Sequence, residues 1–252
     1  NVFDALTVLD CLRVARAYST TNLVFRNQLE ALAKTLHPLF AANEEAVFVV
    51  FEGGEGPGKS TQAALLAERL GAVLTREPGG TEFGAQLRGL LLASSEHEVP
   101  MTDRAEALLM AADRAQHVAQ VLRPSLESGV DVVCDRYIGS TVAYQGAGRG
   151  LDPIELAGIS SWASGGLVPD LVVLLTVDAA TAAERIGPAR DRIEAAGPTF
   201  HRRVADSFLE QAAAAPERWR VLDGAGTVDE VCERVWRAVV DRWPALEADD
   251  RG

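Results

Sequence analysis

The sequence predicts an α/β fold in which helices flank a parallel sheet. Two observations lead to this prediction. Val47 to Phe51 is an unbroken β-branched and aromatic run, as expected for a strand that is buried on both faces. Further strand candidates follow it, each separated from the next by at least one helical pattern, at residues 72–75, 130–134, 171–177 and 220–222. Such an alternation of strands and helices is the pattern of α/β proteins.

Three predicted helices have a start that the sequence marks. Each start pairs an N-cap oxygen with an acid three positions later: Asp103 with Glu106, Asp152 with Glu155, and Thr227 with Glu230. From the first of these starts we predict one long helix that ends before Gly129, a residue suited to a helix C-terminus.

The domain organisation follows from changes in pattern along the chain. Residues 1–45 have leucines at helical spacing and are predicted to form a helical N-terminal extension or the tail of an upstream domain. Residues 46–243 form the α/β domain, and 244–252 a C-terminal tail. The first residue is Asn1 rather than Met, so we expect a processed product or a piece of a longer polypeptide.

Composition narrows the classes of function. The 252 residues include 36 Asp and Glu against 24 Lys and Arg, a net charge of -12, which argues against a nucleic-acid-binding protein. No apolar run approaches the roughly 18 residues of a membrane span, so no membrane contact is expected. Cys11, Cys134 and Cys232 lie far apart, which suggests neither a zinc site nor a disulfide framework. We therefore expect a cytoplasmic protein.

A phosphate-binding loop follows the first strand directly. The segment fits the pattern G-x-x-x-x-G-K-S/T and precedes an amphipathic stretch, as the motif requires. Glycines let successive backbone N–H groups face one anion, and the next helix adds its positive end. The predicted ATP-binding residues are Gly53, Gly54, Glu55, Gly56, Pro57, Gly58, Lys59, Ser60 and Thr61. Lys59 would contact the β- and γ-phosphates, and the Ser60 hydroxyl would hold Mg²⁺.

The phosphoryl acceptor must be inferred from other residues. If the acceptor is itself a phosphate, it needs no general base, and catalysis reduces to alignment and charge neutralisation. Arginines near the ends of predicted elements are then the expected groups: Arg76, Arg114, Arg136, Arg149, Arg185, Arg190 and Arg192. Surface exposure is the usual fate of an arginine, so position alone does not select among them.

One cluster lies where doubly wound folds bind ligands. Asp135 and Arg136 follow the strand at 130–134 and so lie at the carboxyl edge of the sheet. Asp135 would order a Mg²⁺-bound water or an arginine there, and a strand-end salt bridge is the alternative. About ten residues later, Tyr144 and Gln145 offer a flat ring and an amide that can meet the edge of a base.

Several spaced motifs, in this order, resemble bacterial thymidylate kinases over roughly residues 46 to 243. They are Phe51-Glu52-Gly53 leading into the phosphate loop, Thr75-Arg76-Glu77-Pro78-Gly79-Gly80-Thr81, Asp113-Arg114, Asp135-Arg136-Tyr137, Ala143-Tyr144-Gln145-Gly146, Gly148-Arg149-Gly150, Val168-Pro169-Asp170-Leu171 and Asp191-Arg192-Ile193-Glu194. The resemblance implies a P-loop NTPase fold with a five-stranded parallel sheet. It also implies a homodimer that forms dTDP from dTMP and ATP with Mg²⁺.

The resemblance also implies roles for single residues. Glu55 would lie near the 3'-hydroxyl of the sugar, and Tyr144 would crowd the 2' position. Arg136, and also Arg76, would hold the acceptor phosphate. The residues that would face the thymine are Arg114, Thr141 and Gln145.

Two departures from the family pattern leave alternatives open. Met110 replaces the aromatic ring that the family places on thymine, so another pyrimidine monophosphate stays open as acceptor. The expected lid, residues 181–196, looks short and weakly basic. The phosphate loop has no extra basic residue, so Arg185 or Arg190 would be the catalytic arginine, while Arg192 would be either a lid arginine or an ion-pair partner. The remaining alternative is an ATP-binding module with little turnover, fused to an upstream domain.

Overall fold

A computed structural model describes residues 46–93, 101–186 and 191–246. The helical stretches expected within residues 1–45 lie outside these ranges, as does the end of the expected C-terminal tail, residues 247–252. Within the described ranges, no helix is both long enough and apolar enough to span a bilayer.

Five strands form one sheet in the order β2-β3-β1-β4-β5, and every neighbouring pair is parallel. The strands are β1 (Phe48–Glu52), β2 (Val73–Arg76), β3 (Val132–Asp135), β4 (Leu171–Thr176) and β5 (Trp219–Asp223). This arrangement confirms the predicted fold class, and each predicted strand lies within two residues of an observed one. All five carboxyl ends meet at one edge of the sheet, as the predicted ligand site requires.

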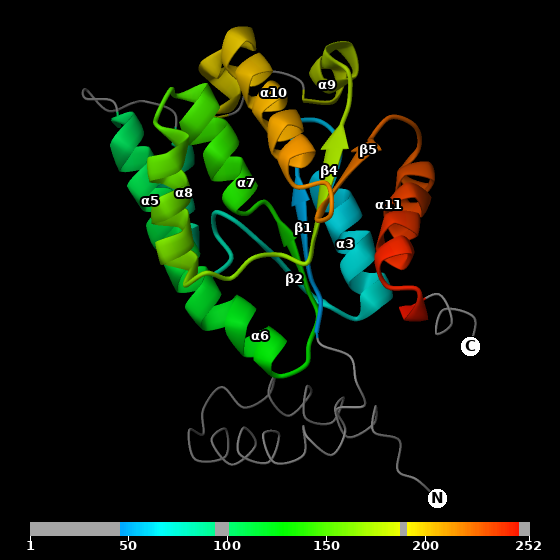
Figure 1. The fold of residues 1–252 in the computed structure, drawn as a ribbon. Helices are drawn as coiled ribbons and strands as arrows, with labels where there is room; N and C mark the ends of the chain where they lie inside the picture. The colour runs from blue at the N-terminus through cyan, green and yellow to red at the C-terminus, as the bar shows by residue number, and fades with distance from the viewer. Residues whose placement is uncertain (1–45, 94–100, 187–190, 247–252) are drawn as a thin grey trace, which may run out of the picture.

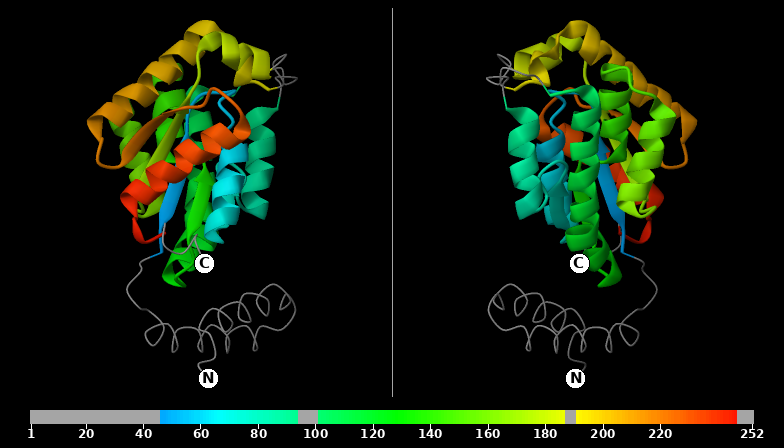
Figure 2. Two further views of the ribbon diagram at one scale, coloured as in Figure 1. Left: turned by 90° about the vertical axis from the view of Figure 1, so that its right-hand side faces the viewer. Right: turned by 90° about the vertical axis from the view of Figure 1, so that its left-hand side faces the viewer.

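Helices cover both faces of the sheet and make three layers (Figures 1 and 2). The first half of the domain contributes α3 (Lys59–Leu70), α4 (Glu82–Leu92), α5 (Asp103–His117), η1 (Val118–Leu122), α6 (Arg123–Glu127) and α7 (Ile138–Thr141). The second half contributes η2 (Val142–Gly148), α8 (Pro153–Ser164), α9 (Ala179–Ile186), η3 (Glu194–Ala196), α10 (Pro198–Ala214) and α11 (Val228–Arg242). In Figure 1, α3 and α11 lie on one side of the sheet, and α5, α7 and α10 on the other.

The core has a cluster of apolar side chains on each face because successive residues of β1 point to opposite sides. Val49 and Phe51 pack with α3 and α11, where Val235 and Val239 are buried. Phe48 instead packs against Val118 and other residues of the opposite layer. All five residues of β1 are buried, as its uninterrupted apolar run predicts.

Two of the three predicted helix starts are confirmed. The Asp152 carboxylate accepts the N–H groups of Ile154 and Glu155, and Thr227 forms a complete capping box with Glu230.

The third start is wrong by one residue. The hydroxyl of Thr102, not the carboxylate of Asp103, accepts the N–H of Ala105, so Thr102 is the N-cap of α5. The Glu106 side chain is turned into the protein, where it pairs with arginines.

The predicted long helix is helical throughout but is not one α-helix. Residues 118–122 form the π-helical segment η1 between α5 and α6. Pro124 lies two residues after the end of this segment. Its nitrogen carries no N–H to donate, and its ring clashes with the preceding turn, which favours a wider turn there.

Candidate active site

The phosphate loop wraps between β1 and α3, as predicted. Gly53 has φ of 140°, and a Cβ at this position would lie 2.4 Å from the carbonyl oxygen of Leu175 on β4. Only glycine fits that approach. Gly58 precedes α3 in a left-handed conformation, and the open N-terminal end of this helix faces the loop. A pocket at this end is lined by Glu55, Gly56, Pro57, Gly58, Lys59, Ser60, Thr61, Gln62, Arg185, Gly224, Gly226, Thr227, Val228 and Val231.

Lys59 lies buried at the centre of this loop. Its ammonium group donates a hydrogen bond to the carbonyl oxygen of Gly54. Burial and the nearby charge of Arg136 lower the pKa of Lys59 to about 8, although Glu55 and Asp135 oppose the shift. An added polyphosphate would therefore stabilise the charged form of Lys59.

Ser60 and Asp135 lie together at the edge of the loop. The Ser60 hydroxyl donates to Oδ2 of Asp135, while the buried Oδ1 has no hydrogen-bond partner among the described residues. A hydroxyl and a free carboxylate oxygen are the hard oxygen ligands that Mg²⁺ prefers when phosphates supply the others. The described residues contain no cluster of three or more acidic, His or Cys side chains that would bind a metal unaided. The pair fits a cation that arrives with a nucleotide.

Glu55, Arg136 and Tyr144 form a triad between the phosphate loop and the rest of the site. Arg136 pairs with Oε1 of Glu55 and donates to the carbonyl oxygen of Gly53 at 2.9 Å. The Tyr144 hydroxyl donates to the same carboxylate oxygen at 2.8 Å. Burial raises the pKa of Glu55, but Arg136, Lys59 and the Tyr144 hydrogen bond outweigh it and lower that pKa to about 2.

The backbone of Arg136 adopts an uncommon conformation. Its φ of 72° is the only positive value of a non-glycine residue in the described chain. Glu52, which is 1% exposed, stabilises the turn after it by accepting the N–H groups of Tyr137 and Ser140, both at 3.0 Å. Burial raises the pKa of Glu52. The turn aims the Arg136 guanidinium back over the phosphate loop.

A second pocket lies on the other side of this triad. It is lined by Glu55, Glu77, Pro78, Arg88, Leu92, Met110, Arg114, Arg136, Tyr137, Ser140, Thr141, Tyr144, Gln145, Asp191, Ile193 and Glu194. The structure thus brings together every predicted acceptor-side residue except Arg76. Met110 and Arg114 come from α5, and Thr141, Tyr144 and Gln145 from α7 and η2.

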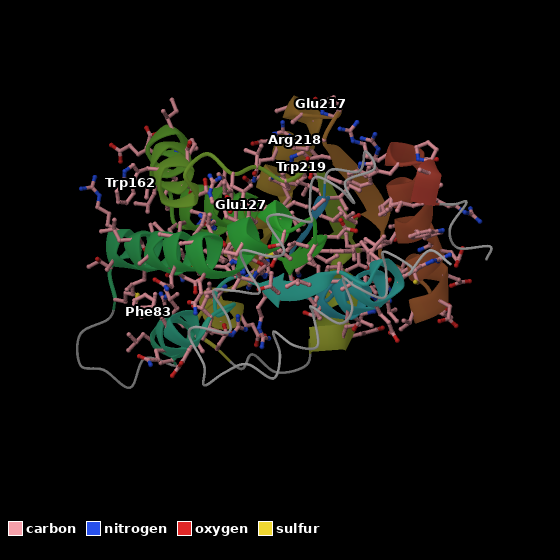
Figure 3. All side chains as sticks on the ribbon, turned by 90° about the horizontal axis from the view of Figure 1, so that it is seen from below. Phe83, Glu127, Trp162, Glu217, Arg218 and Trp219 are labelled. Atoms are coloured by element: carbon pink, nitrogen blue, oxygen red, sulfur yellow. The ribbon has the colours of Figure 1, made fainter. Side chains whose placement is uncertain are left out.

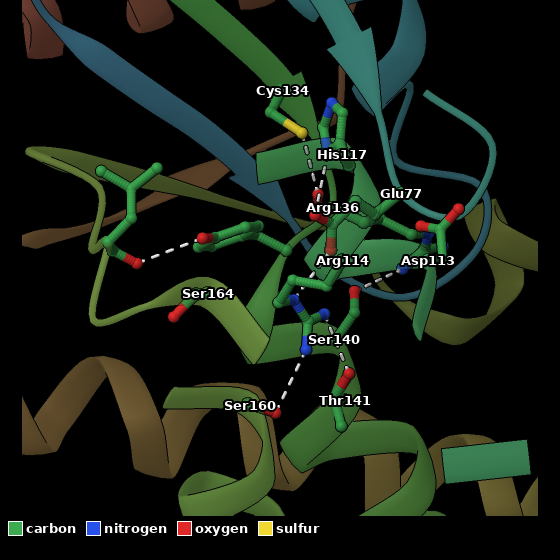
Figure 4. A network of polar contacts seen from close by, with 12 residues as sticks. Glu77, Asp113, Arg114, His117, Cys134, Arg136, Ser140, Thr141, Ser160 and Ser164 are labelled. Atoms are coloured by element: carbon green, nitrogen blue, oxygen red, sulfur yellow. Dashed lines mark hydrogen bonds and ion pairs between the residues drawn. The ribbon is translucent and has the colours of Figure 1, made fainter. Parts of the chain in front are cut away.

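Arg114 is held rigidly in that pocket by a polar network (Figure 4). Its guanidinium donates to Glu77 at 2.9 Å, to Ser160 at 3.1 Å and to Thr141 at 3.0 Å. Glu77 also contacts His117, so one carboxylate holds two side chains of α5. Arg114 lies in the last turn of α5, near an element end as expected from the sequence, and is 2% exposed.

The other predicted arginines are placed differently. Arg185 lines the first pocket and donates to the carbonyl oxygen of Gly224 at 2.9 Å. Arg76 is exposed and lines neither pocket. Arg190 lies outside the described residues. Arg192 is an ion-pair partner, as one of its two expected roles required, and pairs with Glu106 at 2.6 Å.

Sequence reasoning missed Arg88. This residue of α4 lines the second pocket and donates to the carbonyl oxygen of Pro78 at 3.0 Å. Burial and the charges of Arg76 and Arg136 lower the pKa of Arg88. Repulsion of this kind marks a gathering of positive charge that an anion would relieve. The available signal was spacing, since Arg88 is one helical turn after the buried Gly84.

A phosphate loop and an arginine-lined pocket thus share the carboxyl edge of one parallel sheet, with Glu55 lining both. This combination defines a nucleoside monophosphate kinase, an enzyme that passes a phosphoryl group from a nucleoside triphosphate to a second nucleotide.

Comparison with known proteins identifies the family. The thymidylate kinase family model matches residues 51–235. The thymidylate kinase of Cutibacterium acnes is 50% identical over 198 residues, covering 77% of this chain and 96% of that protein. That of Clavibacter sepedonicus is 52% identical over 200 residues, covering 76% and 93%. The crystal structure of the Ehrlichia chaffeensis thymidylate kinase superposes with a TM-score of 0.64 at 30% identity, covering 78% of this chain and 99% of that one.

The chain belongs to the thymidylate kinase family. It is an enzyme that phosphorylates dTMP with ATP and produces dTDP.

Proposed function

We propose that the two pockets are the ATP and dTMP sites and that the Glu55–Arg136 pair marks where the phosphoryl group passes between them. The observation that carries this assignment is that Glu55 lines both pockets while Arg136, paired with it, lines the second. The reacting phosphates must meet at the boundary of the two sites, and Lys59 and Arg136 converge there.

The dTMP phosphate is already an anionic nucleophile, so the residues need only align it and balance charge. Arg136, with Arg88 beside it, would bind the acceptor phosphate. Lys59 would stay on the β- and γ-phosphates through the transfer. Arg185, which lies against Gly56 and Gly224, is the described arginine that would reach the transferring group from the donor side.

The base and sugar would lie deeper in the second pocket. Thr141 and Gln145 offer a hydroxyl and an amide for the thymine edge, and the Met110 thioether covers a base face. Tyr144 packs edge-on against Phe208, with ring centroids 6.1 Å apart, so its position is fixed. This rigidity supports its proposed role of crowding the 2' position.

Mg²⁺ is proposed as the metal that accompanies ATP. The Ser60 hydroxyl would bind it directly, and Asp135 would hold the Ser60 side chain and a metal-bound water. When bound, the ion neutralises phosphate charge.

A coupled assay of ADP release with dTMP, dUMP, dCMP, UMP and dGMP tests the acceptor site. We expect selective turnover of dTMP that Arg136→Ala strongly reduces. Turnover of dTMP at a near-normal rate in this variant would refute the pocket assignment. ATP binding without turnover of any acceptor would favour a nucleotide-binding module instead.

ATP affinity is expected to fall as the pH rises above about 8. Below this value Lys59 is charged before ATP binds, whereas above it the group must take up a proton, because the phosphates raise its pKa from the value of about 8 in the free site. The loss of ATP affinity approaches at most tenfold per pH unit. Titration calorimetry between pH 7 and 10 measures it, with Lys59→Ala as the control that lacks the dependence. A constant Kd in the unmodified enzyme would contradict this role of Lys59.

We further propose a homodimer formed through α4, α5 and α8. α5 contacts both α4 and α8, and the three helices expose large apolar side chains: Phe83, Leu90, Leu108, Ile154 and Trp162. Trp162 is 84% exposed, and Figure 3 shows it on the same side of the molecule as Phe83. Large apolar side chains exposed on adjacent helices are typical of an interface between subunits.

Trp162→Glu is expected to shift the enzyme to monomers, because it replaces the most exposed apolar side chain of that face with a charge. Sedimentation velocity over a range of concentrations measures the shift. The matched control is Leu209→Glu on α10, which alters an equally apolar side chain, 48% exposed, outside the face. If both variants dissociated to the same extent, or if neither variant dissociated, the result would contradict this interface.

A cytoplasmic location is also proposed. It rests on the requirement for ATP and on the unpaired thiols of Cys134 and Cys232.

A further inference from the structure

A buried carboxylate lies directly behind the proposed base site. Glu106 is 0% exposed and stands on α5 one helical turn before Met110 and two before Arg114. Its Oε1 accepts a hydrogen bond from Nε2 of Gln145 at 2.7 Å. Glu106 itself does not line the pocket. It therefore acts on a ligand only through the residues that it contacts.

Two arginines lie against the Glu106 carboxylate and keep it a hydrogen-bond acceptor. Arg192 lies 2.6 Å and Arg149 3.2 Å from its Oε2, and Arg149 also lies 3.4 Å from Oε1. Guanidinium groups donate hydrogen bonds and cannot accept them, so the Glu106 carboxylate between the two arginines acts as an acceptor. The amide group of Gln145 must therefore present its nitrogen to Glu106.

The amide oxygen of Gln145 is left for the ligand. Within the described chain no hydrogen bond reaches this oxygen, and Gln145 lines the second pocket. Thymine and uracil carry a proton on N3 that this oxygen can accept. Cytosine has a lone pair at N3 and would meet the oxygen with repulsion. A Gln side chain that was free to turn over would offer its nitrogen to cytosine equally well.

We propose that Glu106 is a specificity-determining positioning residue that locks the Gln145 amide in the orientation that selects bases with a proton on N3. This inference rests on the proposed dTMP site. It explains how a site with the adaptable Met110 in place of a ring keeps base selectivity, because selection then depends on an oriented hydrogen bond and not on stacking.

Glu106→Gln tests the proposal, since an amide at position 106 can donate as well as accept and so releases Gln145. We expect kcat/KM for dTMP relative to dCMP to fall at least about tenfold, mainly through KM, because one oriented hydrogen bond discriminates by roughly that factor or more. The ratio of dTMP to dUMP should stay unchanged, since both carry the N3 proton. A general destabilisation of the structure would not lower the dTMP to dCMP ratio and leave the dTMP to dUMP ratio unchanged.

Three further variants complete the experiment. Glu106→Asp keeps an acceptor-only group and should lower the dTMP to dCMP ratio less; it replaces the Gln variant if thermal melting shows that the latter is unfolded. Glu210→Gln, an exposed acid on α10, is the matched control and should change nothing. In a Gln145→Leu background, Glu106→Gln should have no further effect on the ratio.

The outcomes distinguish a failure of the proposed role of Glu106 from a failure of the proposed dTMP site. The role of Glu106 is overturned if the dTMP to dCMP ratio of kcat/KM is unchanged in folded Glu106→Gln. It is also overturned if Glu106→Gln lowers this ratio equally in the Gln145→Leu background. Neither result contradicts the base site. An unmodified enzyme that does not prefer dTMP to dCMP, or whose preference survives Gln145→Leu, overturns the base site and this inference with it.

Discussion

Lys59→Ala is expected to lower kcat on the order of 10³-fold or more, the largest effect of any single change in the donor site. Lys59 is the buried cation of the phosphate loop, and the α3 N-terminus beside it supplies only partial charges. Phosphoryl transfer depends on electrostatic stabilisation, and removal of one such group commonly costs several kcal/mol of transition-state stabilisation. Steady-state kinetics at saturating ATP and dTMP measure this loss.

The control for Lys59→Ala is Arg237→Ala, which removes an exposed positive charge from α11 and should leave kcat unchanged. Thermal melting of the variant checks its fold. We expect no large destabilisation, because the one hydrogen bond that the Lys59 ammonium donates within the described residues goes to the backbone carbonyl of Gly54. A folded Lys59→Ala enzyme with near-normal kcat would refute the assignment.

Arg136→Ala is expected to lower kcat/KM for dTMP by about 10²- to 10³-fold, because it removes the charged group that aligns the acceptor phosphate. It also leaves Glu55 without the guanidinium that lowers its pKa, and places an unpaired carboxylate beside the incoming anion. Initial rates at limiting dTMP measure the effect. The Kd for ATP should change far less than kcat/KM.

Two companion variants distinguish alignment from charge alone. Arg136→Lys keeps the charge but loses the fork that reaches Glu55, Gly53 and Ser140, so it should recover only part of the loss. Arg202→Ala, at an exposed position of α10, is the matched surface control. If Arg136→Lys were as active as the unmodified enzyme, the proposed alignment by a fixed guanidinium would be wrong.

The fold could be predicted from the sequence because its signals are local. The uninterrupted apolar run of β1 reflects burial on both faces, and the capping box at Thr227 needs only residues three apart. The start of α5 was misplaced because Thr102 and Asp103 are both good N-cap residues. The choice between them depends on Glu106, which is drawn into the protein by Arg149 and Arg192 from distant parts of the chain.

The site was predictable where a motif fixes the backbone and less so where packing fixes a side chain. The phosphate loop and Arg136 follow strands, so their place at the sheet edge comes with the topology. Arg76 also ends a strand, yet its side chain is exposed, whereas Arg88 on α4 is turned inward. Which arginine faces a pocket depends on how α4 packs on α5, and no local pattern carries that information.

The left-handed backbone of Arg136 carries a local energetic cost at one position of the site. Glycine would adopt this conformation freely, whereas a side chain there costs on the order of 1 kcal/mol. The Arg136 side chain offsets that cost, because it pairs with Glu55 and donates to the carbonyl oxygen of Gly53, contacts that glycine could not make. A ranking of substitutions by backbone conformation alone would therefore favour glycine here and misjudge the position. The enzyme retains a locally unfavourable residue because the guanidinium must reach back over the phosphate loop from this turn.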